Sequence, residues 1–343
     1  MNITKQCYIL FLCFFSSIQA IELNNVRQFI DVKTLAAQVK IEKLLDNNQF
    51  ILELPNGVVV NEGGVLTSNG YILQDTQNSL SPQHGLMKNN NTINQDTHLY
   101  FHGSLAIISS PGSENWYHWL LQILPRLIIL KNSSFSYDRI YINNVKYKWQ
   151  TQSLDIVLQY LNIPPEKLLI INGDCVIQAT NLIVPSVPFI PIKGSPLPDW
   201  LKNDLKAIFL TKQDNTVVWD RIYISRANAS MRRIINEKEL ITELEKIGFK
   251  VIHLELLSPY EQAQIFNHAQ VIVGPHGSGF ANLIFTNPGC KVVEIDYDKP
   301  RSFYRQMSKI MSCYYYPFYA DKMKDEDMVV DIEKFIQFIS KKF

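Results

Sequence analysis

Residues 271–285, VIVGPHGSGFANLIF, have the composition of a turn that binds an anion. A β-branched run leads into three glycines and one histidine within six residues, and an apolar, helix-like segment follows. Glycines let a backbone approach a ligand closely, and the free N–H groups at a helix N-terminus attract negative charge. We interpret this glycine turn as a phosphate cradle made of Gly274, His276, Gly277, Ser278 and Gly279. A tight strand-to-helix turn without a ligand is the alternative.

Three well-defined motifs do not fit these letters. A dinucleotide fingerprint GxGxxG that starts at Gly277 needs a third glycine where the chain has Asn282. A nucleophile elbow GxSxG around Ser278 needs glycines at the positions of His276 and Phe280. A Walker A loop needs Gly-Lys followed by Ser or Thr, which the turn lacks. An anion cradle that carries one histidine remains.

A second cluster of anion-binding side chains lies upstream. Arg226, Arg232 and Arg233 fall within eight residues, directly after a strand expected at 221–225. Guanidinium groups pair well with phosphate oxygens. Because ligands of parallel sheets bind at the carboxyl ends of the strands, we expect this arginine loop to share a site with the glycine turn. A solvated surface loop is the alternative.

A polar stripe marks an otherwise apolar helical segment in the first half of the chain. Asn115, His118, Gln122 and Arg126 are spaced by three, four and four residues, so they share one face of a helix. Two interpretations stay open. The stripe is the wet face of an amphipathic helix, or it presents the imidazole of His118 to a cleft as a general base.

Asp296 and Asp298 follow an expected strand and match an Asp-x-Asp metal motif. Two carboxylates of this kind can hold a divalent cation on a nucleotide diphosphate. Only a short segment follows, however, and it is too small for the acceptor half that such an architecture builds downstream. We therefore expect no metal ion to be required.

Alternating strand and helix patterns predict an α/β fold. In the second half, an amphipathic helix at 237–248 and a helix opened by the capping box Ser258-Pro-Tyr-Glu261 separate short apolar runs, as in a Rossmann-like half with a parallel sheet. The helix at 113–130 is expected to kink at Pro125. The expected strands are 137–143, 168–171, 221–225, 250–254, 270–274 and 291–295, and further helices are expected at 154–161 and 279–285.

Proline spacing predicts the domain boundary. Five prolines between Pro185 and Pro198 are typical of an extended linker. A chain of 343 residues also favours two domains, because single cores stop growing near about 250–300 residues. We expect an N-terminal domain at 21–190, a C-terminal domain at 200–322, and a last helix at 323–343 that is a candidate for packing back on the N-terminal domain.

The first twenty residues resemble a secretory targeting segment. Lys5 precedes a short apolar run at 8–15, and small residues follow up to Ala20. The run is too short for a spanning helix, so a cleaved signal peptide is favoured over a short signal anchor and over a buried strand. Among the glycosylation sequons, the one at Asn132 follows an apolar helix and is expected in a surface loop, which is typical of a glycoprotein.

Composition narrows the class further. With 46% apolar and 19% charged residues the chain is an ordinary globular protein, and a net charge of +1 argues against a general nucleic-acid binder. No CxxC spacing occurs, so a zinc site is not expected. Outside the first twenty residues, Cys175, Cys290 and Cys313 allow one disulfide whose pairing the sequence does not specify.

Together these motifs resemble glycosyltransferase family 61, in order, over roughly residues 100–300. The combination is much more specific than any single motif, and the first hundred residues show no such match. The N-terminal part of the resemblance is NWYHW at 115–119 with LPR at 124–126. The C-terminal part is YISR at 223–226, RRIINE at 232–237, VGPHGSG at 273–279, ANL at 281–283, PG at 288–289 and VVE at 292–294.

The family contains inverting transferases of the secretory pathway. They include plant xylosyl- and arabinosyltransferases and animal enzymes that add N-acetylglucosamine to EGF-like domains or to O-mannose glycans. The resemblance implies a GT-B fold, with two Rossmann-like domains facing a cleft and the donor in the C-terminal one, and a location in the ER or Golgi lumen. This chain has Ser278 and Phe280 where the family more often has Ala and Leu, which changes the pocket but keeps both glycines.

The implied reaction moves a sugar from a UDP-sugar to a hydroxyl group of a glycan or glycoprotein. The diphosphate would contact the glycine turn and the arginines, which stabilise the leaving group without a metal. His118 is the first candidate for the base, His276 for a contact to the diphosphate or the sugar, and Glu294 for the ribose hydroxyls. The implied donor contacts are Arg226, Arg232, Arg233, Gly274, His276, Gly277, Ser278, Gly279, Asn282 and Glu294, and the acceptor-side residues are Asn115, Trp119, Gln122 and Arg126.

The competing hypothesis is a non-catalytic protein that binds a nucleotide sugar or a carbohydrate through a degenerate site. The retained arginines and His276 argue against it. Under either hypothesis no nucleic-acid partner is expected, and a membrane is a partner only if the N-terminal segment is an uncleaved anchor.

Overall fold

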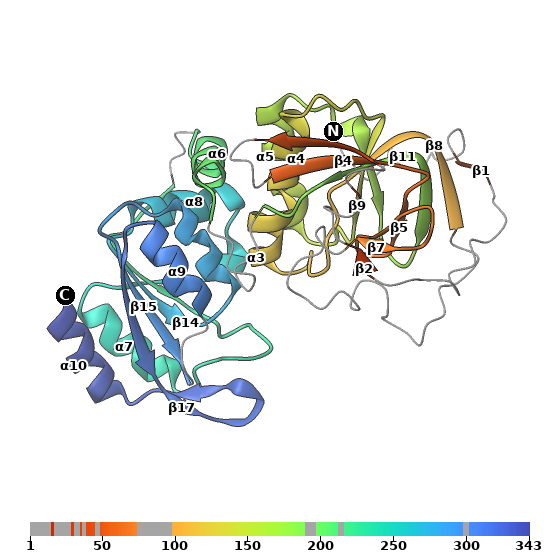
Figure 1. Cartoon of the computed structure of the whole chain (residues 1–343). Helices are drawn as coiled ribbons and strands as arrows, with labels where there is room; N and C mark the ends of the chain where they lie inside the picture. Colours follow the sequence, from red (N-terminus) through yellow and green to blue (C-terminus); the bar gives the residue numbers. More distant parts are fainter. Residues whose placement is uncertain are drawn as a thin grey trace. The chain divides into compact units, whose positions relative to one another are not determined.

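The structure is a computed structural model that describes residues 15–16, 29–30, 35, 39–44, 49–73, 98–188, 197–211, 216–297 and 302–343. It divides into two compact units, Met1–Leu201 and Lys202–Phe343 (Figure 1). Both units have an α/β fold, as the alternating patterns predict. No helix among the described residues is long and apolar enough to cross a bilayer.

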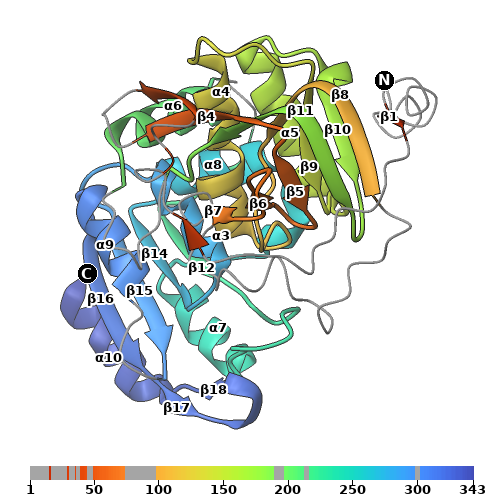
Figure 2. The same ribbon diagram turned by 45° about the vertical axis from the view of Figure 1, so that its right-hand side comes forward.

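A parallel strand group forms the centre of the first unit. The order β10-β9-β8-β11 is parallel throughout, and Figure 2 shows these four strands side by side. Helical segments connect β8 to β9 and β9 to β10, so the predicted βαβ pattern is confirmed. The elements are β8 (His98–Ile107), β9 (Arg139–Asn143), α5 (Lys148–Leu161), η6 (Pro165–Lys167), β10 (Leu168–Ile171) and β11 (Val176–Pro185).

Antiparallel strands from the first hundred residues extend this sheet. β4 and β5 both pair with β11, and Leu52, Leu54 and Val59 enter one core cluster with buried residues of β8 and β11. The sheet of the first unit is therefore mixed rather than purely parallel. The further strands are β1 (Phe15–Ser16), β2 (Phe29–Ile30), β3 (Lys40–Leu44), β4 (Gln49–Pro55), β5 (Val58–Val60), β6 (Gly64–Leu66) and β7 (Ile72–Leu73).

The targeting segment predicted at the N-terminus lies mostly outside the described residues. Within it, β1 pairs with β8 in antiparallel register, Phe15 opposite Phe101. The Asn-rich part of the chain before β8 and the proline-rich residues 189–196 also lie outside the described residues.

The helix that carries the polar stripe is interrupted by a π turn. It consists of α3 (Trp116–His118), the π-helical turn η5 (Trp119–Ile123) and α4 (Pro125–Lys131). Pro125 has no N–H and its ring clashes with the carbonyl four residues back, so an α-helical ladder cannot run through this point. The widened turn is closed instead by the bond from the Leu124 N–H to the Trp119 carbonyl, 2.9 Å long. The predicted disruption at Pro125 is thus a π turn.

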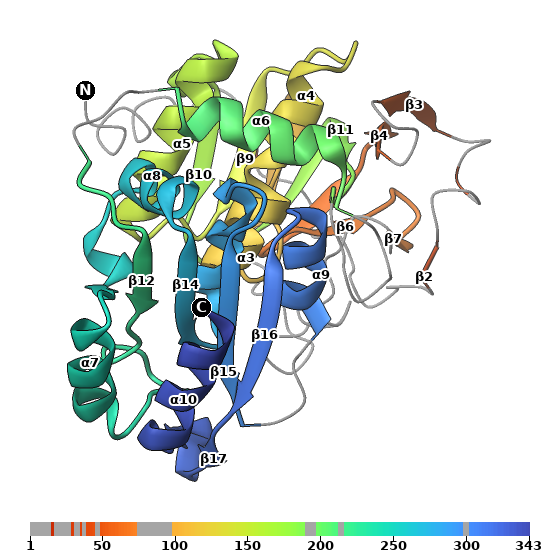
Figure 3. The same cartoon turned by 90° about the vertical axis from the view of Figure 1, so that its left-hand side faces the viewer.

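The second unit is a doubly wound parallel sheet in the order β13-β12-β14-β15-β16 (Figure 3). The chain moves outward from β12 to β13 and then returns to β14 on the other side of β12. The edge between β12 and β14 is therefore the topological switch point, where such sheets bind their ligands. The strands are β12 (Arg221–Ile224), β13 (Lys250–Ile252), β14 (Val271–Pro275), β15 (Lys291–Asp296) and β16 (Tyr314–Tyr319).

Helices cover both faces of this sheet. The capping box predicted for α8 is confirmed, because the Ser258 hydroxyl accepts from the Glu261 N–H at 3.3 Å and the Glu261 carboxylate accepts from the Ser258 N–H at 2.6 Å. The segment expected as a helix at 279–285 is a 3₁₀ helix, η9. The elements are α6 (Asp199–Phe209), α7 (Glu237–Lys246), η8 (Leu254–Leu256), α8 (Pro259–His268), η9 (Ser278–Phe285), α9 (Ser302–Ile310), β17 (Asp321–Lys322), η10 (Lys324–Glu326), β18 (Met328–Val329) and α10 (Ile332–Lys342).

The last helix packs within the second unit. Phe335 and Ile339 of α10 are buried in one core cluster with Leu240 and Leu244 of α7, and the two helices lie side by side (Figure 1). Packing of this helix on the N-terminal domain stays a prediction. A helix has one apolar stripe, and that of α10 is used in its own unit.

Candidate functional site

The arginine loop and the glycine turn meet at the switch point of the second unit. Arg226 follows β12, Gly277 follows β14, and these strands are hydrogen-bonded neighbours. A Cβ atom placed on Gly277 would lie only 2.1 Å from Nη1 of Arg226. A side chain at position 277 would therefore displace the guanidinium of Arg226 from its place beside the turn. The turn and the arginine form one site.

Two guanidinium groups in this loop have unused donors. Nε of Arg226 and Nε of Arg232 are buried and have no hydrogen-bond partner among the described residues. Arg226 donates through Nη2 to the Met231 carbonyl at 3.0 Å, and Nε of Arg232 lies 3.7 Å from the carboxylate of Glu326. Burial lowers the pKa of Arg226, and the positive charge of Arg232 lowers it further. Neighbouring cations with buried free donors are an arrangement that an anion stabilises.

A buried carboxylate holds the start of the arginine loop. Glu237, at the beginning of α7, accepts from the Tyr223 hydroxyl at 2.8 Å, the Ser225 hydroxyl at 3.0 Å and the Arg226 N–H at 3.3 Å. Burial raises the pKa of Tyr223 far above its ordinary value, so this hydroxyl remains a donor. Glu237 belongs to the motif RRIINE at 232–237 and fixes the backbone from which Arg226 extends.

Arg233 is engaged elsewhere and does not share the role predicted for its neighbours. Its Nε and Nη2 donate to Asp327 at 3.0 and 2.6 Å, and its N–H donates to the same carboxylate at 2.9 Å. Hydrogen bonds from Arg233 lower the pKa of Asp327. This bidentate pair joins the arginine loop to the segment between η10 and β18. We therefore interpret Arg233 as a residue that positions the loop.

The other two glycines of the turn are required by packing. A Cβ atom on Gly274 would lie 3.0 Å from Cβ of Ile224, and one on Gly279 would lie 2.5 Å from Cδ1 of Leu254. They let β14 and η9 approach β12 and η8. Half-buried Ser278 opens η9, and the first N–H groups of a helix have no partner within the helix. The predicted cradle thus consists of these N–H groups beside the Arg226 guanidinium.

His276 is the centre of a buried polar chain. Its Nδ1 lies 2.5 Å from one Glu294 carboxylate oxygen, and Tyr315 of β16 donates its hydroxyl to the other oxygen. His276 follows the carboxyl end of β14, Glu294 lies in β15 opposite Gly274 and Pro317, and Tyr315 lies near the start of β16, opposite Val292. A carboxylate on Nδ1 orients the ring and stabilises positive charge on it, and leaves Nε2 as the nitrogen for a ligand. Burial raises the pKa of Tyr315, and the charge of Glu294 adds to that rise.

Two aromatic side chains close this side of the site. The Tyr304 ring of α9 lies 5.3 Å from the His276 ring and 5.4 Å from the Phe280 ring, centroid to centroid. The interaction with Tyr304 raises the pKa of Arg226. The sequence analysis did not find Tyr304, Tyr315 or Glu237 as site residues. Only the pairing of β15 with β16 and the packing of α9 on η9 reveal the two tyrosines, whereas Glu237 was visible as the end of a motif.

Asn282 and Asp296, both singled out in the sequence, contact other side chains of the protein. Asn282 is fully buried and donates to the side chain of Gln262 at 2.9 Å, so it ties η9 to α8. Asp296 is buried, and its carboxylate lies 3.9 Å from Nδ1 of His276. Its partner in the Asp-x-Asp motif, Asp298, lies outside the described residues. No cluster of three or more metal-ligating side chains occurs in the described parts of the chain.

In the first unit, His118 and Gln122 form a pair on the π turn. Nδ1 of His118 lies 2.6 Å from Oε1 of Gln122, and the Tyr117 ring packs edge-on at 5.3 Å. Burial lowers the pKa of His118, although the hydrogen bond with Gln122 opposes that shift. The imidazole is therefore neutral at pH 7, as a general base requires. π turns are frequent at functional sites, which supports the functional interpretation of this pair.

Trp119 and the other two residues of the polar stripe, Asn115 and Arg126, make contacts within the protein. Trp119 is fully buried and donates its indole N–H to Ser153 at 2.8 Å, and Asn115 caps α3 by accepting from the Tyr117 N–H. Arg126 is fully buried as well. Its guanidinium donates to the carbonyls of Pro185, Ser109 and Ile108, at distances from 2.6 to 3.3 Å. Trp119 and Arg126 thus make contacts within the protein, and their acceptor-side role stays a prediction.

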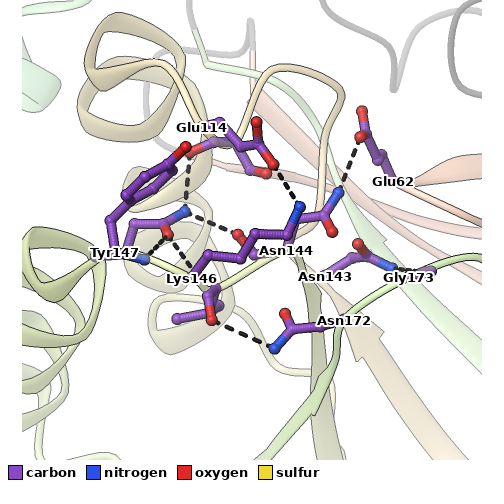
Figure 4. A network of polar contacts seen from close by, with 11 residues as sticks. Glu62, Glu114, Asn143, Asn144, Lys146, Tyr147, Asn172 and Gly173 are labelled. Atoms are coloured by element: carbon purple, nitrogen blue, oxygen red, sulfur yellow. Dashed lines mark hydrogen bonds and ion pairs between the residues drawn. The ribbon is translucent and has the colours of Figure 1, made fainter.

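A further polar network lies at the carboxyl end of β9 (Figure 4). Asn143 donates to the Gly173 carbonyl at 2.9 Å, Asn144 donates to Glu62 at 2.9 Å, and Lys146 pairs with Glu114 at 2.6 Å. The sequence analysis did not predict this network, because its members come from distant segments. It gives the first unit a polar edge where strands of its parallel group end.

Comparison with known families agrees with the resemblance seen in the motifs. The family model described as Glycosyltransferase 61 matches residues 116–293, which contain His118, the arginine loop, the glycine turn and the first half of β15. No curated protein matches the chain at a significant level. The match covers more than half of the chain. The chain therefore belongs to the glycosyltransferase 61 family and is a glycosyltransferase.

Proposed function

We propose that this protein is an inverting glycosyltransferase that moves a sugar of the xylose, N-acetylglucosamine or arabinose class from a UDP-sugar to a hydroxyl group of a glycan or glycoprotein. One observation carries the donor assignment. Arg226 holds a buried Nε donor without a hydrogen-bond partner among the described residues, beside the glycine turn at the switch point of a parallel sheet, and Arg232 is a neighbouring cation in the same loop. A diphosphate supplies the negative charge and the acceptor oxygens that this arrangement lacks.

The roles of the donor-site residues follow from their positions. The diphosphate contacts Arg226, Arg232 and the N–H groups of Ser278 and Gly279 at the start of η9. His276, held at Nδ1 by Glu294, offers Nε2 to the diphosphate or the sugar. Because Glu294 already accepts from His276 and Tyr315, we assign it to this positioning role rather than to the ribose hydroxyls.

The reaction needs stabilisation of the leaving group and removal of one proton. The acceptor oxygen attacks the anomeric carbon, the bond from that carbon to the phosphate oxygen breaks, and the configuration inverts. Negative charge develops on UDP, so the fixed guanidinium and N–H donors stabilise the transition state more than the ground state. The acceptor proton passes to a base, for which we propose neutral His118. A divalent metal has no necessary part in this scheme.

The cellular setting belongs to the same proposal. Family members act in the secretory pathway, so we place the enzyme in the ER or Golgi lumen, with the N-terminal segment as signal peptide or anchor. The GT-B arrangement, with the second unit as donor domain and the first as acceptor domain, is likewise proposed on the family assignment.

Calorimetric titration with UDP tests the donor assignment. Arg226→Ala should weaken UDP binding about 10- to 100-fold, the effect of losing a charged hydrogen bond. Arg221→Ala is the matched control, because Arg221 is a guanidinium at the opposite end of the same strand, bonded to the Ile247 carbonyl. Equal affinities for the two variants would remove the arginine loop from the site.

Turnover separates the enzyme from the competing hypothesis of a non-catalytic nucleotide-sugar binder. A hydrolysis and transfer screen over UDP-xylose, UDP-N-acetylglucosamine and UDP-arabinose should show one preferred donor, with activity retained in EDTA. His118→Ala should keep UDP affinity and lose transfer. Tight binding without turnover of any donor would favour the binder, and loss of all activity in EDTA would restore the metal interpretation of Asp296.

A further inference from the structure

Cys290 and Cys313 face each other across two neighbouring strands. β15 pairs with β16 in parallel register from Lys291 opposite Tyr314, so the two cysteines are the residues just before the first pair. The backbone is bonded on both sides of them, from the Tyr314 N–H to the Cys290 carbonyl at 2.9 Å and from the Gly289 N–H to the Ser312 carbonyl at 2.8 Å. Adjacent strands lie about 4.8 Å apart, which is within the Cα separations that a disulfide spans.

The two thiols already interact with each other and are unequal. The two side chains interact electrostatically, and Cys290 is buried whereas Cys313 is partly exposed. This interaction, with Thr286 at 3.3 Å and the positive charge of Lys206, lowers the pKa of Cys313 to about 7, while the pKa of Cys290 is raised. A thiolate is the nucleophile in thiol–disulfide exchange, so Cys313 is the reactive member of the pair.

The third cysteine of the described chain has a different environment. Cys175 lies in the first unit, is buried, and is 3.0 Å from the Tyr141 hydroxyl. Burial raises its pKa to about 11, which keeps it a thiol. Of the three cysteines only Cys290 and Cys313 have both the register and the chemistry to react with each other.

We propose that Cys290 and Cys313 form an intramolecular disulfide. The oxidant is a disulfide donor, either oxidised glutathione or the disulfide form of a thiol oxidoreductase. The Cys313 thiolate attacks one donor sulfur and expels the other as a thiolate, and the Cys290 thiol then loses its proton and attacks Sγ of Cys313. The two cysteines give up two electrons and two protons, and the donor is reduced to two thiols.

The bond closes a ring around part of the candidate site. Glu294 of β15 and Tyr304 of α9 lie within residues 290–313, so the disulfide joins the two ends of the segment that supports His276. A covalent link at both ends limits the conformations of the unfolded segment and thereby stabilises the folded one. The proposal stands independently of the donor and acceptor of the enzyme.

Peptide mapping of the full chain after equilibration with oxidised glutathione tests the pairing. Free thiols are alkylated before a non-reducing digest. We expect a Cys290–Cys313 linked peptide, with Cys175 alkylated only after unfolding. Alkylated Cys290 and Cys313, or a linkage that involves Cys175, would overturn the proposal.

Thermal unfolding with and without dithiothreitol gives a second measurement. Reduction should lower the midpoint by about 5–10 °C in the wild-type chain and in the Cys175→Ala control. The double variant Cys290→Ala, Cys313→Ala should start lower and show no response to dithiothreitol. A response of the double variant equal to that of the wild type would contradict the disulfide.

Discussion

At the scale of single residues, the Arg226 guanidinium occupies the space beside Gly277 that a side chain would fill. The guanidinium lies where the Cβ atom of any other residue at position 277 would be, 2.1 Å from Nη1. The backbone of Gly277 is extended, with φ of 177°, so conformational freedom is not what requires glycine here. The requirement is space for a cation beside the N-terminus of η9. A motif search identifies the glycine but not this reason for it.

Gly277→Ala should weaken UDP binding about 10-fold or more, because the methyl group forces the Arg226 guanidinium away from the turn. A double-mutant cycle with Arg226→Ala isolates this cause. In the Arg226→Ala background the glycine substitution should have little further effect on affinity in calorimetric titration. Full additivity of the two losses would show that the methyl group acts on something other than the arginine.

His118 provides a pH-dependent prediction. The hydrogen bond that His118 donates from Nδ1 to the Gln122 amide oxygen holds the pKa of His118 above the value that burial alone would give. Gln122→Met removes that bond at nearly constant volume, so the pKa of His118 falls further. If His118 is the base, the acid limb of the kcat–pH profile should move to lower pH in this variant. A limb that stays in place would exclude His118 as the titrating base.

At the scale of elements, the segment α3-η5-α4 combines a site residue with a structural anchor. The π turn before Pro125 places His118 and Gln122 together, and one turn later Arg126 enters the core. Arg126 satisfies carbonyls at the ends of β8 and β11, which makes it the fixed point of the helix on the sheet. The predicted polar stripe thus separates into a functional pair and a buried anchor.

Arg126→Met should destabilise the first unit by about 3 kcal/mol, because it leaves buried carbonyl groups without a donor. Lys131→Met is the matched control, since Lys131 is an exposed cation at the end of the same helix. Urea unfolding should show a clear loss for the first variant and a change within about 0.5 kcal/mol for the second. Similar midpoints for both would contradict the anchoring role.

Local patterns in the sequence predicted most of the elements of the second unit. β-branched runs gave the strands, and Ser258 with Glu261 gave the start of α8, because capping and periodicity act within one turn. The 3₁₀ form of η9 and the π turn were not predicted, since both depend on packing. The contacts of Arg233, Trp119 and Arg126 within the protein were not predicted for the same reason, because burial depends on distant segments that no local pattern contains.

At the scale of the whole molecule, the donor site lies within one compact unit. Arg226, Gly277 and His276 all belong to Lys202–Phe343, and their supports Glu237 and Tyr315 do too. We therefore expect donor recognition to be a property of the second unit, whereas the proposed base belongs to the first.

Hydrogen–deuterium exchange of the full chain with and without UDP tests this division. Residues 226–237 and 276–285 should gain the strongest protection, because the nucleotide orders the arginine loop and the start of η9. The control is the same experiment with Arg226→Ala, in which protection at equal UDP concentration should largely disappear. Protection confined to residues 98–185 would place the nucleotide in the first unit.

The strand order of the second unit also determines at which stage of folding its candidate site forms. The arginine loop is synthesised before β13, but β14 must cross over and pair with β12 before Gly277 meets Arg226, and β15 must follow to hold His276. Such long-range parallel pairing forms late on a folding pathway. UDP then has nothing to bind until the sheet is nearly complete. It should therefore slow the unfolding of this enzyme far more than it speeds refolding, and so lengthen the lifetime of the native state.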